Sequence, residues 1–198
     1  MRRCRTLPLG IDAGATRVRA ALVETDSSGR PSLVAVATRE RTGELHADVA
    51  AAVGELATSE RRCVLAVAAP HADLRAMIFP RMNRHEQDKA ARFEACRYLG
   101  DSAAEAIVRV APTDADGISV VGTVPRPVLH DLTSAARQAK LCPIAVDHAG
   151  LALRRALPQA SVIGDLGHNG LVVYAPASHV PSIRYASIGG KDFTHASA

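Results

Sequence analysis

The chain has 198 residues, of which 47% are hydrophobic and 3% aromatic, and its formal net charge is +4. This composition predicts a folded protein with a buried core, and the few aromatic residues argue against a surface that stacks single-stranded nucleic acid. The longest apolar stretches, 63–70 and 171–177, are far shorter than the roughly 20 residues of a membrane-spanning helix, so we expect a cytoplasmic protein.

The cysteines and the basic residues show no pattern typical of a site. Four cysteines are widely spaced without a C-x-x-C pair, which predicts free thiols rather than a disulfide framework or a zinc site. The basic residues are scattered along the chain, so we expect a solvated surface and no nucleic-acid partner.

The first 70 residues predict a strand-rich unit. Apolar alternation indicates strands at 7–12, 18–22 and 32–38, with a turn of small residues at 13–16 between the first two. Helical spacing of apolar residues follows at 44–58. The stretch 63–69 is apolar on both faces, which predicts a central strand covered by helices.

Residues 71–124 predict a small inserted α+β unit. Strands are expected at 74–79, 106–111 and 118–124, the last two joined by a hairpin turn at 114–117. A helix is expected at 83–99, where Asn83 and Glu86 have the spacing of a capping box. Ala90, Ala91, Phe93 and Tyr98 can then form an apolar stripe on this helix.

The remaining sequence resumes the alternation of helices and strands. Helices are expected at 128–140 and 148–157, and strands at 144–146, 161–165, 171–174 and 182–187. The last three strands repeat the pattern with which the chain begins.

Two segments share the order apolar strand, acid, glycine-containing turn, second strand. In the first, Asp12 precedes the turn Gly14-Ala15-Thr16, and in the second, Asp165 precedes Gly167. A tight turn without bulky side chains lets backbone N–H groups approach phosphate oxygens, and a nearby acid can hold Mg²⁺ through water. Either turn alone is equally compatible with a plain β-hairpin, whereas two copies can grip a phosphate chain from both sides.

A third segment carries two consecutive glycines at a strand end. Gly189 and Gly190 precede the expected start of a helix, which is a common anion-binding arrangement. A loop in which Asp192 or Thr194 caps the helix explains the same residues.

These segments resemble the phosphate motifs of the actin, Hsp70 and sugar-kinase superfamily. Within it, three further stretches resemble the PilM family of type IV pilus assembly proteins, in family order along nearly the whole chain: 78–95, 139–153 and 183–190. The resemblance implies an α/β, actin-like (ribonuclease H-like) ATPase fold. It implies subdomain 1A at 1–70 and 125–159, an inserted subdomain 1C at 71–124, and the start of subdomain 2A at 160–198.

The resemblance also implies ATP and Mg²⁺ between the two halves of the fold. Asp12 and Asp165 are then expected near the metal, through water, and the glycine turns near the phosphates. Asp147 lies where relatives keep the residue that orients the attacking water. An N-cap of the following helix is the alternative for Asp147.

Two departures from the family pattern limit this expectation. Ala15 stands where relatives usually have a hydroxyl, which leaves Thr16 as the main candidate. The sequence ends soon after Gly190, where relatives continue into the adenine-binding segment, so we expect a truncated fold. The resemblance therefore predicts an incomplete ATP site and no competent ATPase in this chain.

The function implied by the resemblance is that of a scaffold. Subdomains 1A and 1C are expected to hold the extended cytoplasmic tail of a PilN-like inner-membrane protein, which would make the chain peripheral to the membrane through its partner. The resemblance is compatible with a homo-oligomer. The alternatives are a scaffold resembling GspL or FtsA, and a small-molecule kinase of the same superfamily.

Overall fold

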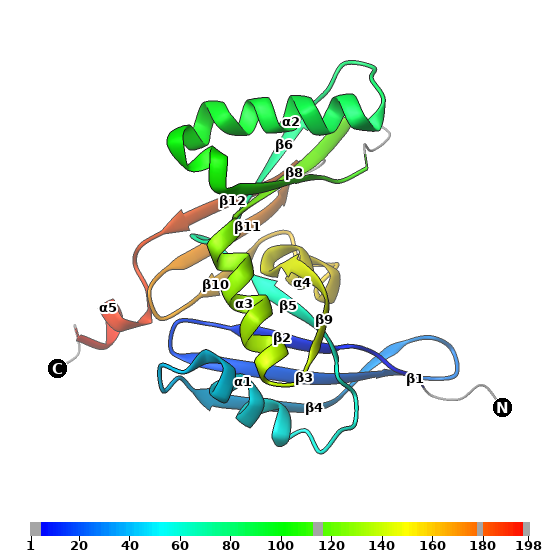
Figure 1. The fold of residues 1–198 in the computed structure, drawn as a ribbon, viewed down its shortest axis with the longest axis vertical. Coiled ribbons are helices and arrows are strands. Elements are labelled where there is room, and N and C mark those ends of the chain that lie inside the picture. Colours follow the sequence, from blue (N-terminus) through cyan, green and yellow to red (C-terminus); the bar gives the residue numbers. More distant parts are fainter. Residues whose placement is uncertain (1–4, 113–116, 178–179, 196–198) are drawn as a thin grey trace. The chain divides into compact units, whose positions relative to one another are not determined.

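The computed structural model describes residues 5–112, 117–177 and 180–195. The chain divides into two compact units, one formed by residues 1–67 and 130–149 and the other by residues 68–129 and 150–198 (Figure 1). Each unit is therefore assembled from two separate stretches of sequence. The subdomain boundaries expected from the sequence stay a prediction.

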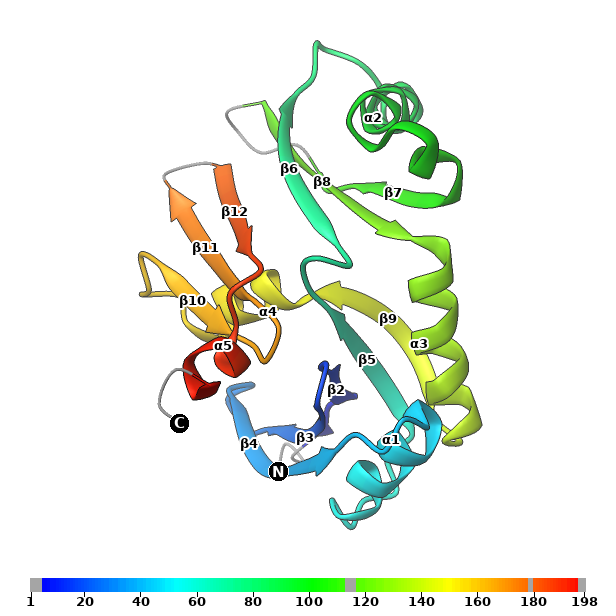
Figure 2. The ribbon, with the colours of Figure 1, turned by 90° about the vertical axis from the view of Figure 1, so that its left-hand side faces the viewer.

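The first unit is built on one mixed sheet. Its strands are β1 (Arg5–Thr6), β2 (Leu9–Ala13), β3 (Arg17–Thr25), β4 (Pro31–Glu40), β5 (Arg62–Val67) and β9 (Cys142–His148). Strand β2 pairs antiparallel with β3 and parallel with β5, and β5 pairs parallel with β9 (Figure 2). Strand β3 also pairs with β4 and with the short β1. The expected strand at 63–69 is confirmed as an inner strand of the sheet, but it ends at Val67 and its residues alternate between buried and half-buried, so the expected burial of both faces is wrong.

Apolar residues on one face of this sheet form the core of the first unit. Leu9, Ile11 and Leu65 are buried there, and helix α1 (Leu45–Gly54) packs over them through Val49. Helix α3 (Arg126–Gln138) begins in the second unit and contributes its C-terminal half, including Ala136, to the same core. Successive side chains of a strand point to opposite faces of the sheet, so these buried residues share one face.

The second unit contains two three-stranded antiparallel sheets. In the first sheet, β8 (Ile118–Pro125) lies between β6 (Asp73–Ile78) and β7 (Ala106–Val110). Helix α2 (Arg84–Leu99) covers one face of this sheet, and the 3-10 helix η1 (Gly100–Glu105) leads from it into β7 (Figure 1). The expected hairpin turn falls largely on residues 113–116, which lie outside the described residues.

The other sheet of this unit carries the second glycine turn. It has the order β10 (Ile163–Leu166), β11 (Leu171–Ala177) and β12 (Val180–Ala186), and it packs against α4 (Ala149–Ala156) through Ile163, Tyr174 and Leu153. The short helix α5 (Gly190–His195) follows β12.

Helix α2 confirms one expectation and corrects another. The capping box is present, because the Asn83 side chain accepts from the Glu86 backbone N–H and the Glu86 carboxylate accepts from the Asn83 N–H. Within the predicted apolar stripe, Ala91 is buried as expected, but the placement of Phe93 in it is wrong, since 68% of this residue is exposed. Ala91 and Ala95 face the sheet instead, because a small side chain lets the helix lie close to the strands.

Candidate functional site

The first glycine turn lies at the end of β2, in the first unit. The Gly14 N–H donates to the Arg17 carbonyl at 2.9 Å, which closes a tight hairpin. A Cβ atom on Gly14 would lie 3.2 Å from that carbonyl oxygen, so a larger residue would strain the turn. Ala15 and Thr16 are exposed at its tip. The turn thus has the open, small-residue form that a phosphate group needs.

Two arginines flank this turn, and neither was among the predicted site residues. Arg19 on β3 lies opposite Asp12, and its guanidinium is 3.0 Å from the Asp12 carboxylate. Arg41, just after β4, donates its backbone N–H to the Thr16 carbonyl at 2.8 Å and its Nη1 to the Gly14 carbonyl at 3.4 Å. The turn therefore lies in a positive environment, and both of its outer carbonyls are held by one residue.

The two arginines differ in what the sequence reveals about them. Asp12 and Arg19 are equally distant from the centre of the hairpin turn, so their pairing follows from antiparallel register. Arg41 approaches the turn from a third strand whose register shifts at a bulge between Leu22 and Val23, and such a shift has no sequence signature.

Asp147 shares a row of the sheet with Asp12. Both residues pair with Ala66 on the intervening strand β5, Asp12 from β2 and Asp147 from β9. The Asp147 carboxylate accepts a hydrogen bond from the His148 N–H at 2.8 Å. Because α4 begins at Ala149, Asp147 belongs to the strand and is separated from the helix by His148. The fold thus brings two of the predicted acids together at the carboxyl ends of parallel strands.

The second glycine turn lies between β10 and β11, in the second unit. The Gly167 N–H donates to the Gly170 carbonyl at 2.8 Å, and Asp165 is the third residue of β10, as predicted. This turn therefore repeats the geometry of the first, with an acid on the incoming strand and a glycine at the turn. The spatial relation between the two turns, which belong to different units, stays a prediction.

Gly189 and Gly190 pack directly on the second turn. The Gly190 N–H donates to the Gly167 carbonyl at 2.8 Å and the Lys191 N–H to the His168 carbonyl at 3.2 Å. The Gly189 N–H donates to the Asp192 carboxylate at 2.8 Å, which is half of a capping box. Three backbone donors of the third motif are thus used inside the fold. This contact indicates that the glycine pair braces the turn.

Only glycine fits at position 189. A Cβ atom there would lie 2.2 Å from the His168 carbonyl oxygen and 2.4 Å from the Gly170 nitrogen. These are backbone atoms, so the contact could not be relieved by a change of side-chain rotamer. The close approach of two backbone segments explains the glycine at this position without a ligand.

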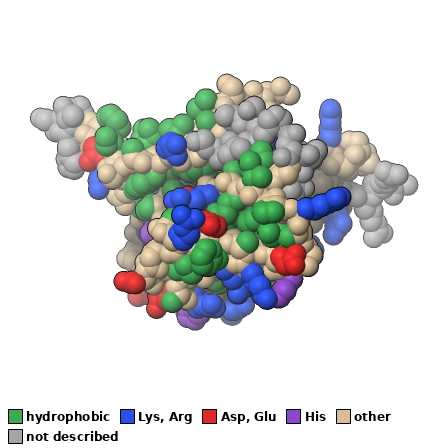
Figure 3. All heavy atoms as spheres, turned by 90° about the horizontal axis from the view of Figure 1, so that it is seen from above, with side chains coloured by type: hydrophobic (Ala, Val, Ile, Leu, Met, Phe, Trp, Pro, Cys, Tyr) green, Lys and Arg blue, Asp and Glu red, His purple; other side chains and the backbone are tan. Residues whose placement is uncertain are grey.

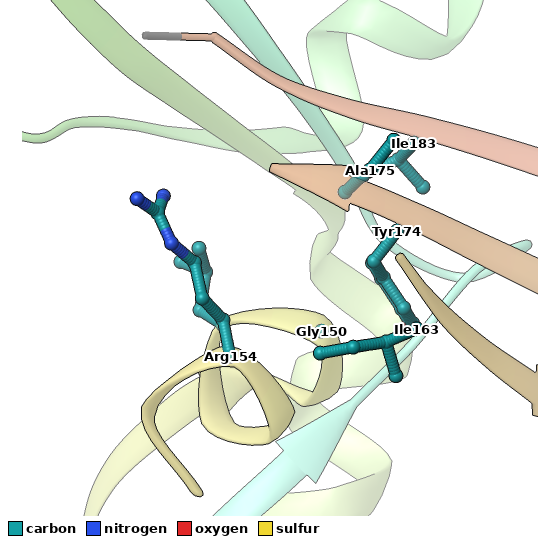
Figure 4. A pocket seen from close by; sticks show the side chains of 7 residues that line it. Gly150, Arg154, Ile163, Tyr174, Ala175 and Ile183 are labelled. Atoms are coloured by element: carbon teal, nitrogen blue, oxygen red, sulfur yellow. The ribbon is translucent and has the colours of Figure 1, made fainter. Parts of the chain in front are cut away.

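A small recess lies between α4 and the sheet of β10–β12. Gly150, Ile163, Tyr174 and Ile183 line it, and Figure 4 shows the Arg154 side chain lying apart from the Tyr174 ring. Its enclosed volume of about 10 Å³ is that of about one water molecule. A Cβ atom on Gly150 would lie 1.9 Å from the Tyr174 ring, so the recess is a packing seam rather than a ligand site.

Among the described residues, no group of three or more His, Cys, Asp or Glu side chains could hold a metal ion. The same part of the chain contains no helix that is both long and apolar enough to cross a membrane.

The structure is similar to several solved proteins. It matches the PilM-PilN type IV pilus biogenesis complex with a TM-score of 0.82 and 25% identity, over 96% of this chain and 64% of that chain. It also matches the cytoplasmic domain of EpsL, an inner-membrane component of the type II secretion system of Vibrio cholerae, with a TM-score of 0.66 and 12% identity over 92% and 71% of the two chains. A protein of Bacteroides thetaiotaomicron with an actin-like ATPase fold matches with a TM-score of 0.54 and 7% identity, over 96% and 73%.

No protein-family model and no curated protein matches the sequence. The chain spans 64% of the length of the chain it matches in the pilus complex. The expected fold class is confirmed by these structural similarities, as is the resemblance to PilM stated from the motifs. The protein has the actin-like ATPase fold and, within that fold, is PilM-like.

Proposed function

We propose that this protein is a scaffold of type IV pilus assembly that binds the cytoplasmic tail of a PilN-like membrane protein. The observation that carries the proposal is the similarity to the PilM-PilN complex along 96% of the chain. Such a partner would make the protein peripheral to the inner membrane.

The face of the sheet β6–β8–β7 that lies away from α2 is the proposed docking surface for the tail, at the end of β6 where Ile78 is exposed, since Leu74 on the same face is buried. Strand alternation places Leu74, Ala76 and Ile78 of β6 opposite Gly122, Val120 and Ile118 of β8, on the face away from α2. Ile78 is 78% exposed, the largest exposed fraction among the large hydrophobic residues of the described chain. An extended tail with apolar residues at alternate positions would bury this face.

Binding of a tail peptide tests the proposal directly. A fluorescently labelled peptide with the sequence of the natural PilN-like partner's tail is titrated with the 198-residue chain, and Ile78→Asp is expected to weaken binding at least tenfold. Leu157→Asp, a change at another residue that is 49% exposed, serves as the matched control and should leave the affinity unchanged. Absence of binding by the unaltered chain would overturn the scaffold proposal.

The turn after β2 is proposed to hold nucleotide phosphates. The residues fit this group in part: the turn is open and exposed at Thr16, and Arg19 lies beside Asp12 as a counter-charge. Mg²⁺, when bound with ATP, would neutralise phosphate charge, and Asp12 and Asp165 are the acids proposed for it, each through water. Arg19 would then turn from Asp12 toward a phosphate oxygen.

ATP binding is a separate question from tail binding. Calorimetric titration with MgATP measures it, and Arg19→Ala is expected to weaken any binding about tenfold because a charge-assisted hydrogen bond is lost. Arg30→Ala, at an exposed loop position, is the control. Equal affinity of Arg19→Ala and the unaltered chain would exclude the first turn as the phosphate site, without bearing on the scaffold proposal.

A further inference from the structure

Helix α2 has an unusual distribution of side chains. Its buried positions are occupied by alanine, with Ala91 and Ala95 at 0% and 1% exposure, while Phe93 is 68% exposed. A helix that packs only through its neighbouring sheet places its large apolar residues inward. The outward ring leaves a large apolar group on the outer side of the helix.

The residues around Phe93 give this surface its charge. Positions spaced by three or four residues share one side of a helix, and here they are His85, Lys89, Arg92 and Cys96. The stripe of His85, Lys89, Arg92 and Cys96 contains no acid, whereas the exposed Glu86, seven residues before Phe93, lies on the same side of the helix as the ring. Neither Lys89 nor Arg92 has an ion-pair partner among the described residues.

Each acid of α2 has a polar contact within the helix or at its N-terminus. The Glu86 carboxylate accepts from the Asn83 N–H at 2.8 Å, Asp88 lies 3.7 Å from Arg84, and Glu94 lies 3.0 Å from Arg97. The charges of Asp88 and Glu94 are thus compensated within the helix, whereas the hydrogen bond to Glu86 comes from a neutral N–H and compensates no charge. Figure 3 looks onto the molecule from above, where α2 lies in Figure 1, and shows Lys and Arg side chains alongside both hydrophobic and acidic ones.

We propose that this side of α2, defined by His85, Lys89, Arg92, Phe93 and Cys96, binds the surface of an anionic lipid bilayer. Two uncompensated cations would lie at the level of the lipid headgroups, each attracted by the negative surface potential. Phe93 would enter the boundary between headgroups and acyl chains, as aromatic residues do in interfacial helices. A convex helix side fits a deformable membrane surface, whereas an acidic peptide would need a groove to lie in.

The chain contains no tryptophan, so the fluorescence of a single introduced tryptophan reports only on the position where it is placed. The Phe93→Trp variant carries one indole on this surface, and its emission should shift to shorter wavelength with vesicles containing phosphatidylglycerol, but not with pure phosphatidylcholine vesicles. Leu33→Trp, on β4 in the other unit and 62% exposed, is the matched reporter and should show no shift. The purified 198-residue chain is used without any protein partner.

Sedimentation with the same anionic vesicles measures the charge contribution. Each cation is worth roughly a fivefold change in partitioning, so Lys89→Glu with Arg92→Glu should lower binding at least about 25-fold. Phe93→Ser should lower it about tenfold. The control pair Arg30→Glu with Arg137→Glu changes the net charge equally at exposed positions in the first unit, and should have less than about a twofold effect.

Three results would overturn the proposal: no binding to anionic vesicles, equal binding to neutral ones, or equal loss in the control pair. Circular dichroism of every variant verifies that α2 is retained. Because no PilN-like tail is present in these experiments, their failure leaves the scaffold proposal untouched, and a failure of tail binding leaves the membrane proposal untouched.

Discussion

Asp12 and Asp147 lie opposite the same residue, Ala66, from the two strands that border β5. Residues paired in this way point to one face of a sheet, so the two carboxylates share a face and are separated by two strand spacings, roughly 10 Å between Cα atoms. Only the methyl group of Ala66 lies between them in this row.

This arrangement predicts different effects for the two acids. Asp12→Asn removes the carboxylate next to the phosphate turn, and we expect at least a tenfold loss of Mg²⁺-dependent ATP affinity in calorimetric titration. Asp147→Asn should change the affinity less than about twofold but abolish any hydrolysis, because orienting water matters only to the reaction. Asp131→Asn, at an exposed helix position, is the control. Equal losses of affinity for both variants would contradict separate roles.

The contact of Gly189 with the second turn predicts that adding a single methyl group at this position destabilises the fold. Gly189→Ala forces a Cβ atom against the His168 carbonyl, and we expect the free energy of unfolding to fall by about 1–3 kcal/mol. Gly54→Ala is the matched change, since a Cβ atom at Gly54 in α1 has no atom within 4 Å. That variant should be neutral or up to about 1 kcal/mol more stable, as alanine favours helices. Urea unfolding compares the two.

Gly150 offers a test by coupling. Alanine would normally stabilise a helix such as α4, yet Gly150→Ala meets the Tyr174 ring, and we expect a loss of about 1–3 kcal/mol. In a chain that already carries Tyr174→Ala, the same change should be neutral or stabilising. The double-mutant cycle isolates the interaction. Additive effects of the two changes would show that the ring does not confine this position.

The Glu60–Arg62 pair predicts a dependence of stability on pH. The hydrogen bond from the Arg62 side chain, aided by backbone donors of Arg62 and Arg61, lowers the pKa of Glu60 from 4.5 to about 2. A carboxyl whose pKa is lowered on folding stabilises the protein above the unfolded pKa, and this stabilisation is lost as pH falls from about 4.5 through about 2.

Glu60→Gln should therefore lower the unfolding temperature near pH 7 and have no effect near pH 2. The difference is expected to be small, because Arg62 is half exposed and solvent screens the pair. Glu105→Gln, at an exposed position, is the control. A difference between Glu60→Gln and the unaltered chain that stays constant from pH 7 to pH 2 would contradict this assignment.

Local patterns predicted most of the elements of this fold. The capping box at Asn83 and Glu86 fixed the start of α2, and the acid-glycine pattern located both turns, because these features depend on neighbours a few residues apart. The alternation of apolar residues placed β5 inside the sheet for the same reason. Such short-range chemistry is legible in a single sequence.

Features that depend on tertiary contact could not be predicted from the sequence. Phe93 fits an apolar helical stripe by spacing, but the side of α2 that packs on the sheet carries Ala91 and Ala95 instead. Arg41 reaches the first turn from a strand with a shifted register, and Gly189 is constrained by a turn 19 to 22 residues earlier in the chain. The sequence shows these residues but not the surfaces they meet.

The pairing of β5 with β9 also determines when the first unit can be completed. Strand β9 begins at Cys142, whereas β5 ends at Val67, and the intervening chain belongs mostly to the other unit. While the chain is being synthesised, the β5 edge has no partner until the ribosome has released residues 142–148. An open strand edge of this kind pairs readily with other chains. Strand β9 must therefore pair with β5 before another chain does, and slow folding of the inserted segment would delay that pairing.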